Sequence, residues 1–219
     1  MKTKSYKWFY DNIHSRYYDL MIKWLIFPFG GEAKARRTIL KPVSFSEDEI
    51  ILEMCSGTGG ATFYISEKAK NKSRIIGIDL SSGQLHQAQM RNYNCPTHFI
   101  EGNVIYVPFQ DESFEKVFVS HAIHEMTREH RYKTLQEAKR VLKPDGEVIV
   151  MEMDIPPSFF IKVFLIFWTF FWLPGNFERP TLLDMLRHGL VTEVRENGFR
   201  DVRKYSAYGN VFQTVVGRK

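Results

Sequence analysis

Two apolar runs in the first third of the chain end in acidic residues. The first ends in Glu53 and opens into a glycine-rich turn that contains Gly57 and Gly59, and the second, 74–78, ends in Asp79. A strand, a glycine turn, a helix and a second acid-tipped strand form a nucleoside-binding half of an α/β sheet. Asp79 is then placed to bind both ribose hydroxyls of a cofactor.

The turn does not match the dinucleotide pattern. That fingerprint has Gly or Ala five residues after its first glycine, where this chain has Thr62. Glu53, just before the turn, would repel a pyrophosphate but suits a cationic ligand. S-adenosylmethionine (SAM) carries a sulfonium and an ammonium group and no phosphate. The electrostatics therefore favour SAM, and a dinucleotide oxidoreductase is the disfavoured alternative.

The order and spacing of several motifs resemble class I SAM-dependent methyltransferases, and within them the ubiquinone/menaquinone C-methyltransferase-like group. The resemblance covers most of the chain. The matching segments are 53–60, 77–81, 102–109, 114–117 and 140–150, together with Tyr17-Tyr18-Asp19 near the N-terminus. It implies SAM as the cofactor and S-adenosylhomocysteine as the product.

The resemblance also implies a set of cofactor contacts, with Glu53, Cys55 and Gly57 at the methionine end and Leu80 against the adenine. The expected cofactor-binding residues are Glu53, Cys55, Ser56, Gly57, Gly59, Asp79, Leu80, Gln84, Asn103, Val104, Ser120 and His121. Two of them depart from the family pattern. Cys55 stands where a glycine is usual, and Asn103 stands where an aspartate is usual, so the adenine contact loses its charge assistance.

The loop after the fourth predicted strand carries the candidates for acceptor chemistry. SAM is already activated, so the enzyme mainly has to orient the acceptor and exclude water, and a base is needed only for a weak nucleophile. His124 is the first candidate for a general base or acceptor contact, and His121 is the second. The alternative is that either histidine only packs in the loop. With Glu125 they lack the His-Glu-x-x-His spacing of zinc sites, so no metal is predicted.

An aromatic segment, 159–173, follows the fifth predicted strand. It has no charge between Lys162 and Pro174 and is too short to span a bilayer. Together with the apolar segment 21–29, it is predicted to form a cap over the acceptor. The expected substrate contacts are Tyr18, His124, Trp168 and Trp172. Contact with a membrane surface is one interpretation of this cap, and ordinary helix burial with formation of a homodimer is the other.

Strands that alternate with helices must position these residues. The pattern predicts one α/β domain over 1–219, with a doubly wound, seven-stranded, mostly parallel sheet, an N-terminal helical cap (1–45) and a hydrophobic insert (156–180). The strands are expected at 50–53, 74–79, 97–101, 114–120, 147–153, 202–205 and 211–216. The helices are expected at 32–40, 61–70, 81–93, 127–142 and 182–197, with a turn at 143–146.

Composition narrows the function classes. The chain has 219 residues, 44% of them hydrophobic, and its 30 basic residues are interleaved with 25 acidic ones for a net charge of +5. This pattern does not favour nucleic acid as a partner but is compatible with an anionic membrane surface. Two cysteines make no disulfide framework, and no signal peptide is evident. A cytoplasmic protein is expected, peripheral at the inner face of the membrane in one interpretation.

The resulting hypothesis is methyl transfer from SAM to a hydrophobic small molecule such as a quinone-like lipid. One alternative is N-, O- or S-methylation of another apolar metabolite or of a phospholipid headgroup. A second alternative, from a different class, is a non-catalytic SAM-binding protein.

Overall fold

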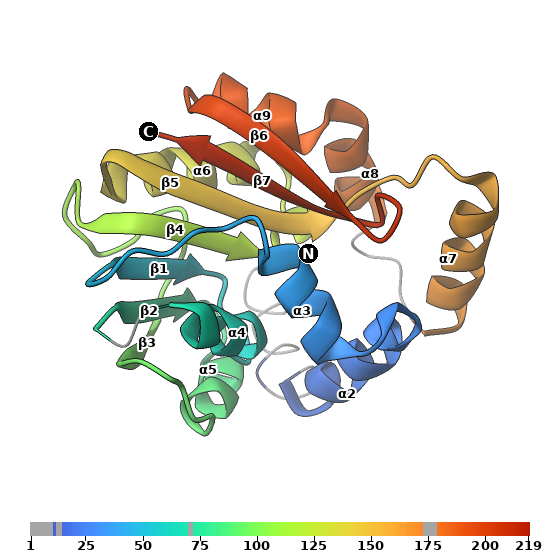
Figure 1. The fold of residues 1–219 in the computed structure, drawn as a ribbon, viewed down its shortest axis with the longest axis horizontal. Coiled ribbons are helices and arrows are strands. Elements are labelled where there is room, and N and C mark those ends of the chain that lie inside the picture. Colours follow the sequence, from blue (N-terminus) through green and yellow to red (C-terminus); the bar gives the residue numbers. More distant parts are fainter. Residues whose placement is uncertain (1–10, 12–14, 70–71, 173–178) are drawn as a thin grey trace.

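A computed structural model describes residues 11, 15–69, 72–172 and 179–219 (Figure 1). Its sheet has the strand order β3-β2-β1-β4-β5-β7-β6. The strands are β1 (Ile50–Met54), β2 (Arg74–Asp79), β3 (Thr97–Glu101), β4 (Phe114–Ser120), β5 (Leu142–Met153), β6 (Arg200–Ala207) and β7 (Phe212–Arg218). Strands β1 to β5 pair in parallel, and β7 is antiparallel to both β5 and β6. The predicted doubly wound, seven-stranded, mostly parallel sheet is confirmed.

Helices cover both faces of the sheet, which explains the apolar runs 50–52, 117–119 and 148–151 in its central strands. The helices are α2 (Ser15–Ile26), η2 (Phe27–Phe29), α3 (Glu32–Leu40), α4 (Gly60–Lys68), α5 (Ser82–Gln89), η3 (Ile123–Glu125), α6 (Arg128–Val141), α7 (Phe159–Trp172), α8 (Arg179–His188) and α9 (Leu190–Glu196). Alternate residues of a strand enter opposite cores: Val117 and Val119 pack with residues of α6, α8 and α9, and Phe118 packs with residues of α3 and α4.

Three local predictions were wrong. The helix expected at 182–197 is divided into α8 and α9 at Gly189, whose φ of +90° interrupts a right-handed helix. Helix α5 ends at Gln89, because the chain turns there and the Tyr93 hydroxyl donates back to the Ala88 carbonyl at 2.8 Å. Strand β5 begins at Leu142, before the expected turn, and its pairing with β4 shifts register between Leu142 and Glu147.

Helices α2 and α7 contact each other at the side of the molecule toward which the arrowheads of β1 and β4 point (Figure 1). This is the carboxyl edge of the parallel strands, where ligands bind in open α/β sheets. Within the described part of the chain, no helix has the length and apolar content needed to cross a membrane. Helix α7 itself has 14 residues.

Candidate active site

The turn between β1 and α4 brings backbone close to the carboxyl edge of the sheet. Cys55, Gly57 and Gly59 all have positive φ values, of +58°, +53° and +74°. A Cβ on Gly59 would overlap the Tyr93 hydroxyl oxygen and lie 3.0 Å from the Ala88 Cβ, so this position favours glycine. Cys55 adopts the left-handed conformation that favours glycine, at the position where the family usually has one.

Asp79 is fixed at the end of β2 by backbone amides. Its Oδ2 accepts from the Gly57 amide at 2.8 Å and its Oδ1 from the Ser81 amide at 2.9 Å. Burial raises the pKa of Asp79, and these two amides counteract part of the rise. The Ser81 hydroxyl caps α5 by accepting from the Gln84 amide at 3.2 Å, and a Cβ on Gly57 would lie 2.8 Å from Gln84 Oε1. Asp79, Gln84 and the glycine turn are therefore neighbours.

Glu53 lies at the end of β1 and is fully buried. Its Oε2 accepts a hydrogen bond from the Thr62 hydroxyl, while its Oε1 has no hydrogen-bond partner among the described residues. Burial raises the pKa of Glu53 to about 7, against the hydroxyl groups of Thr62 and Ser120 and the charge of Arg36. Ser56 Oγ is also buried without a partner in the described part of the chain. Unpaired buried polar atoms are costly and commonly mark a ligand site.

The site has an excess of negative charge. Burial raises the pKa of the Cys55 thiol, and the carboxylates of Asp79, Glu125 and Glu53 raise it further. Cys55 is therefore a neutral thiol and not an activated nucleophile. Three carboxylates around one glycine turn favour a cationic ligand.

The N-terminal region is tied to this turn. Asp19 of α2 accepts from the Thr58 hydroxyl at 2.7 Å and forms an ion pair with Arg91, whose Nε donates to the Thr58 carbonyl at 2.7 Å. Asp11 accepts from the Ser81 hydroxyl at 2.7 Å. Asp11 and helix α2 are thus held against the turns that follow β1 and β2. The side chain of Tyr18, in α2, lies outside the described residues.

Arg36 of α3 is a buried cation that sequence reasoning missed. It is 5% exposed, and its charge acts on both Glu53 and His121. Its Nε has no hydrogen-bond partner within the described ranges. The sequence signal for a buried Arg36 was its position four residues before Leu40, because residues at that spacing share one face of a helix.

The acceptor side combines the two predicted histidines with an acid that was not predicted. His124 Nδ1 lies 2.9 Å from Glu152 Oε2, and His121 Nδ1 lies 3.9 Å from Glu152 Oε1. Glu152 is fully buried near the end of β5. Burial alone would raise its pKa, but His124, then His121 and the Met153 amide, bring it below the usual value. The sequence signal for Glu152 was an acidic residue directly after the apolar run 148–151. The same pattern places Glu53 in β1 and Asp79 at the end of β2.

Comparison with known proteins decides the class of enzyme. Residues 51–146 match the family model for a methyltransferase domain. An uncharacterized methyltransferase of Synechocystis sp. is 28% identical over 92% of this chain and 90% of its own length. A ubiquinone/menaquinone biosynthesis C-methyltransferase of Citrifermentans bemidjiense is 26% identical over 92% of this chain and 91% of its own. The protein is a SAM-dependent methyltransferase.

The fold agrees with this assignment. The crystal structure of a SAM-dependent methyltransferase from Thermotoga maritima superposes with a TM-score of 0.66 at 19% identity, covering 94% of this chain and 98% of that one. The site also fits SAM, because unpaired buried oxygens and three carboxylates surround a turn of open backbone. When bound, SAM supplies a methyl group that is already activated by its sulfonium.

The remaining residues predicted to contact the cofactor or substrate of the methyltransferase lie partly at the surface, partly in the core and partly outside the described residues. Asn103 is exposed, and its Oδ1 accepts from the Ile105 amide at 3.2 Å. Its segment lies beside Asp79, because the Gly102 amide donates to the Asp79 carbonyl at 2.9 Å. Val104 packs into the core, and Leu80 is half-buried. Helix α7 contains the other two predicted substrate contacts, Trp168 and Trp172, but their side chains lie outside the described residues.

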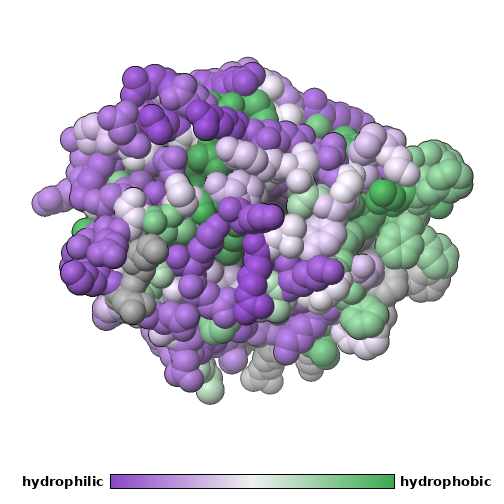
Figure 2. All heavy atoms as spheres, viewed as in Figure 1, coloured by the Kyte–Doolittle hydropathy of each residue, from purple (hydrophilic) through white to green (hydrophobic). Residues whose placement is uncertain are grey.

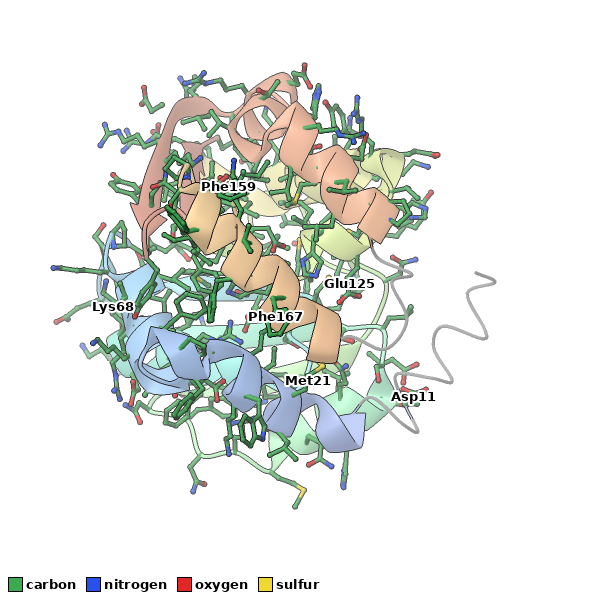
Figure 3. All side chains as sticks on the ribbon, turned by 90° about the vertical axis from the view of Figure 1, so that its right-hand side faces the viewer. Asp11, Met21, Lys68, Glu125, Phe159 and Phe167 are labelled. Atoms are coloured by element: carbon green, nitrogen blue, oxygen red, sulfur yellow. The ribbon has the colours of Figure 1, made fainter. Side chains whose placement is uncertain are left out.

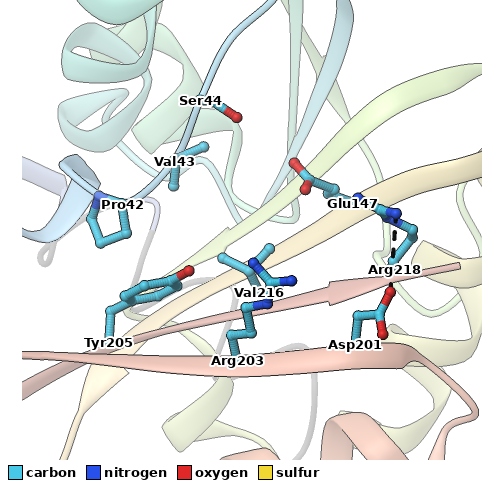
Figure 4. Close-up of a pocket in the computed structure, with 9 residues that line it drawn as sticks. All are labelled: Pro42, Val43, Ser44, Glu147, Asp201, Arg203, Tyr205, Val216 and Arg218. Atoms are coloured by element: carbon cyan, nitrogen blue, oxygen red, sulfur yellow. Dashed lines mark ion pairs between the residues drawn. The ribbon is translucent and has the colours of Figure 1, made fainter.

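A separate pocket lies away from these residues (Figure 4). It is lined by Pro42, Val43, Ser44, Glu147, Asp201, Arg203, Tyr205, Val216 and Arg218. Residues 42–44 precede β1, and Glu147 pairs with Arg218 near the end of β7. These residues lie toward the amino ends of the parallel strands and include none of the predicted site residues.

Proposed function

We propose that this methyltransferase acts on a hydrophobic small molecule, and that the acceptor is a quinone-like lipid methylated on a ring carbon. The observation that carries the proposal is an exposed apolar surface beside the candidate site. The name of the Citrifermentans bemidjiense relative supports the same acceptor class. Asp79 and Glu53 would hold the cofactor, and His124 would contact the acceptor.

The apolar surface, here called the aromatic surface, is shared by α2, η2 and α7. Its members are Leu20, Trp24, Phe27, Phe159, Phe160, Val163, Phe164 and Phe167, which are between 44% and 83% exposed. Figure 2 shows apolar residues gathered over α7, and Figure 3 looks onto the side where α7 and α2 lie. An exposed apolar patch of this kind is typical of an interaction or ligand-entry site.

The aromatic surface is connected to the cofactor turn through α2. Asp19, on the same helix as Leu20 and Trp24, is hydrogen-bonded to Thr58 of the turn. An apolar acceptor that reaches this surface is therefore close to the carboxyl edge of the sheet. Exposed Lys23 and Lys34 flank it, and cations beside exposed aromatic rings favour an anionic membrane surface. Peripheral attachment at the inner face of the membrane follows from this proposal.

The acceptor can be tested with radiolabelled SAM and membrane lipid extracts that contain quinones lacking a ring methyl group, in oxidised and reduced form. We expect label in the quinone fraction. Label in the phospholipid fraction would instead identify headgroup methylation, and label in another apolar metabolite would overturn the quinone assignment. Binding of SAM without transfer to any fraction would favour a non-catalytic SAM-binding protein.

The membrane step has its own test, in which purified protein is sedimented with anionic lipid vesicles. We expect the double variant Phe159→Ser/Phe160→Ser to lose most of its vesicle binding. Tyr106→Ser is the matched control, because Tyr106 is 72% exposed and lies outside the aromatic surface. Equal sedimentation of all three proteins would refute membrane attachment. Concentration-dependent dimers that the double variant abolishes would assign the surface to a homodimer.

A further inference from the structure

We infer that Glu152 is a positioning residue that makes His124 the general base of this methyltransferase, and that the acceptor is therefore a molecule that must lose a hydroxyl proton. This inference rests on the proposed function, because it specifies the acceptor chemistry of the same site. It is carried by the geometry of one buried carboxylate and one imidazole.

The two oxygens of Glu152 have separate partners. Oε1 accepts from the Met153 amide at 2.8 Å, and Oε2 lies 2.9 Å from His124 Nδ1. Glu152 is fully buried and His124 is 9% exposed. Strand β5 is held on both sides at this point, since Met151 pairs with Ser120 of β4 and Glu152 pairs with Gln213 of β7. A carboxylate fixed in this way can hold an imidazole in one orientation.

The pair also selects the tautomer of the imidazole. An ionised carboxylate only accepts hydrogen bonds, so His124 Nδ1 must carry the proton that it donates to Glu152. In neutral His124 the lone pair is then on Nε2, the atom that can take a proton from an acceptor. The same arrangement orients the base in carboxylate–histidine hydrolases.

The neighbouring charges distinguish His124 from His121. Burial, and then the charge of Arg36, lower the pKa of His121 to about 3, so this second histidine is too weak a base near neutral pH. Glu152 faces His124 from β5, and Glu125 follows it in η3. Helix α8, which packs against η3, carries cations at Arg187 and His188 and an acid, Asp184, that is paired with Arg128 and Arg131.

The proposed proton transfer defines the acceptor class. His124 Nε2 takes the hydroxyl proton of a phenol, enol or hydroquinone, which makes the oxygen or the conjugated ring carbon nucleophilic. That atom bonds to the methyl carbon, the carbon–sulfur bond breaks, and its electron pair leaves with S-adenosylhomocysteine. If the ring carbon is methylated, it then loses its own proton and the oxygen regains one. One proton per methyl group is released to solvent in either case.

Nitrogen NMR of the histidine side chains tests the inference without any acceptor. In wild-type protein labelled with 15N-histidine, we expect the neutral form of His124 to carry its proton on Nδ1. Glu152→Gln should lower the midpoint of the His124 titration by about one pH unit or more, because the favourable charge is lost. Glu147→Gln, on the same strand at its amino-terminal side, should leave the midpoint unchanged. A His124→Gln spectrum identifies the signals.

A neutral His124 protonated on Nε2 in the wild type would overturn the inference even if the Glu152 variant does not fold. An unchanged midpoint in a folded Glu152→Gln variant would also overturn it. With the hydroquinone of a menaquinone precursor that lacks its ring methyl group as the probe, we expect Glu152→Gln to lower kcat by about 100-fold. The acidic limb of its pH profile should also move to lower pH, with the KM for SAM unchanged.

Glu152→Asp, which restores the charge, should recover part of kcat. If no acceptor is methylated but the NMR results hold, the proposed function fails while the histidine–carboxylate pair stands. If methylation proceeds at the wild-type rate and with the wild-type pH profile in Glu152→Gln, the positioning role fails alone.

Discussion

Replacing Glu53 with glutamine should remove most of the pH dependence of SAM binding. Glu53 is fully buried with a pKa of about 7, so close to half of it is protonated at neutral pH. Only the carboxylate attracts a cationic ligand. Below pH 7 the ionised fraction falls tenfold per pH unit, so the Kd for SAM at pH 6 should be about tenfold above its value at high pH.

Isothermal titration calorimetry between pH 5.5 and 7.5 measures this slope. The upper limit avoids titration of the ligand's own α-amino group, which ionises near pH 8. In buffers of different ionisation enthalpy, binding to the wild type at pH 7 should release about half a proton, because SAM draws Glu53 into its ionised form. An equal slope and equal proton release in Glu53→Gln would refute the assignment of Glu53 to the cofactor site.

The same carboxyl group should affect stability in a defined direction. The pKa of Glu53 is raised from 4.5 in the unfolded chain to about 7 in the folded one. Its contribution to the free energy of unfolding is therefore fully present below pH 4.5 and is lost as the pH rises through 7. At pH 8 the shift corresponds to a cost of about 3 kcal/mol. In urea, Glu53→Gln should exceed the wild type in free energy of unfolding at pH 8 but not at pH 4, below both pKa values. The exposed Glu47→Gln is the control, and a variant that is less stable at both pH values would contradict the buried-charge argument.

Three further predictions follow from single positions. Asp79→Ala should weaken S-adenosylhomocysteine binding in calorimetry by about 100-fold, because it removes two charge-assisted acceptor atoms; an unchanged Kd would exclude Asp79 from the site. Gly59→Ala should lower both Tm and SAM affinity, because φ is +74° and the new Cβ meets Tyr93; wild-type values in both would refute this. Glu193→Gln should lower the free energy of unfolding in urea by about 3 kcal/mol, because it leaves the fully buried Arg131 charge with only the part-exposed Asp184 as counter-ion; a loss below about 1 kcal/mol would mean that Asp184 compensates.

The central parallel strands β1, β4 and β5 could be predicted because each contains an apolar run whose residues are buried on both faces of the sheet. Helix ends were less predictable where a tertiary contact decides them. The residues 182–197 form a plausible single helix by periodicity, yet Gly189 divides it so that α8 and α9 can each pack on the sheet. Helix α5 likewise stops where Tyr93 and Arg91 turn toward the glycine loop.

The residues that we expect to hold the cofactor could be proposed from the sequence, because they lie in two short segments around Glu53 and Asp79. On the acceptor side, the sequence indicated the two histidines but not their pairing with Glu152. His124 and Glu152 are 28 residues apart and meet because β4 and β5 are adjacent in the sheet, a pairing that no local pattern contains. Arg36 comes from a helix that precedes the sheet, so only the tertiary structure shows its proximity to Glu53.

Three acids at one edge of the sheet, of which Glu53 and Glu152 are fully buried, have different environments, and this difference predicts different roles. Burial holds the pKa of Glu53 near 7 against the hydroxyl groups of Thr62 and Ser120, so a cation at this site would ionise it. Asp79 accepts two backbone amides, which fix its geometry for a neutral ribose. Glu152 faces two histidines, which lower its pKa and keep it charged. We therefore expect the three acids to form a cation site, a diol site and a base-orienting site, according to the donors that their neighbours supply.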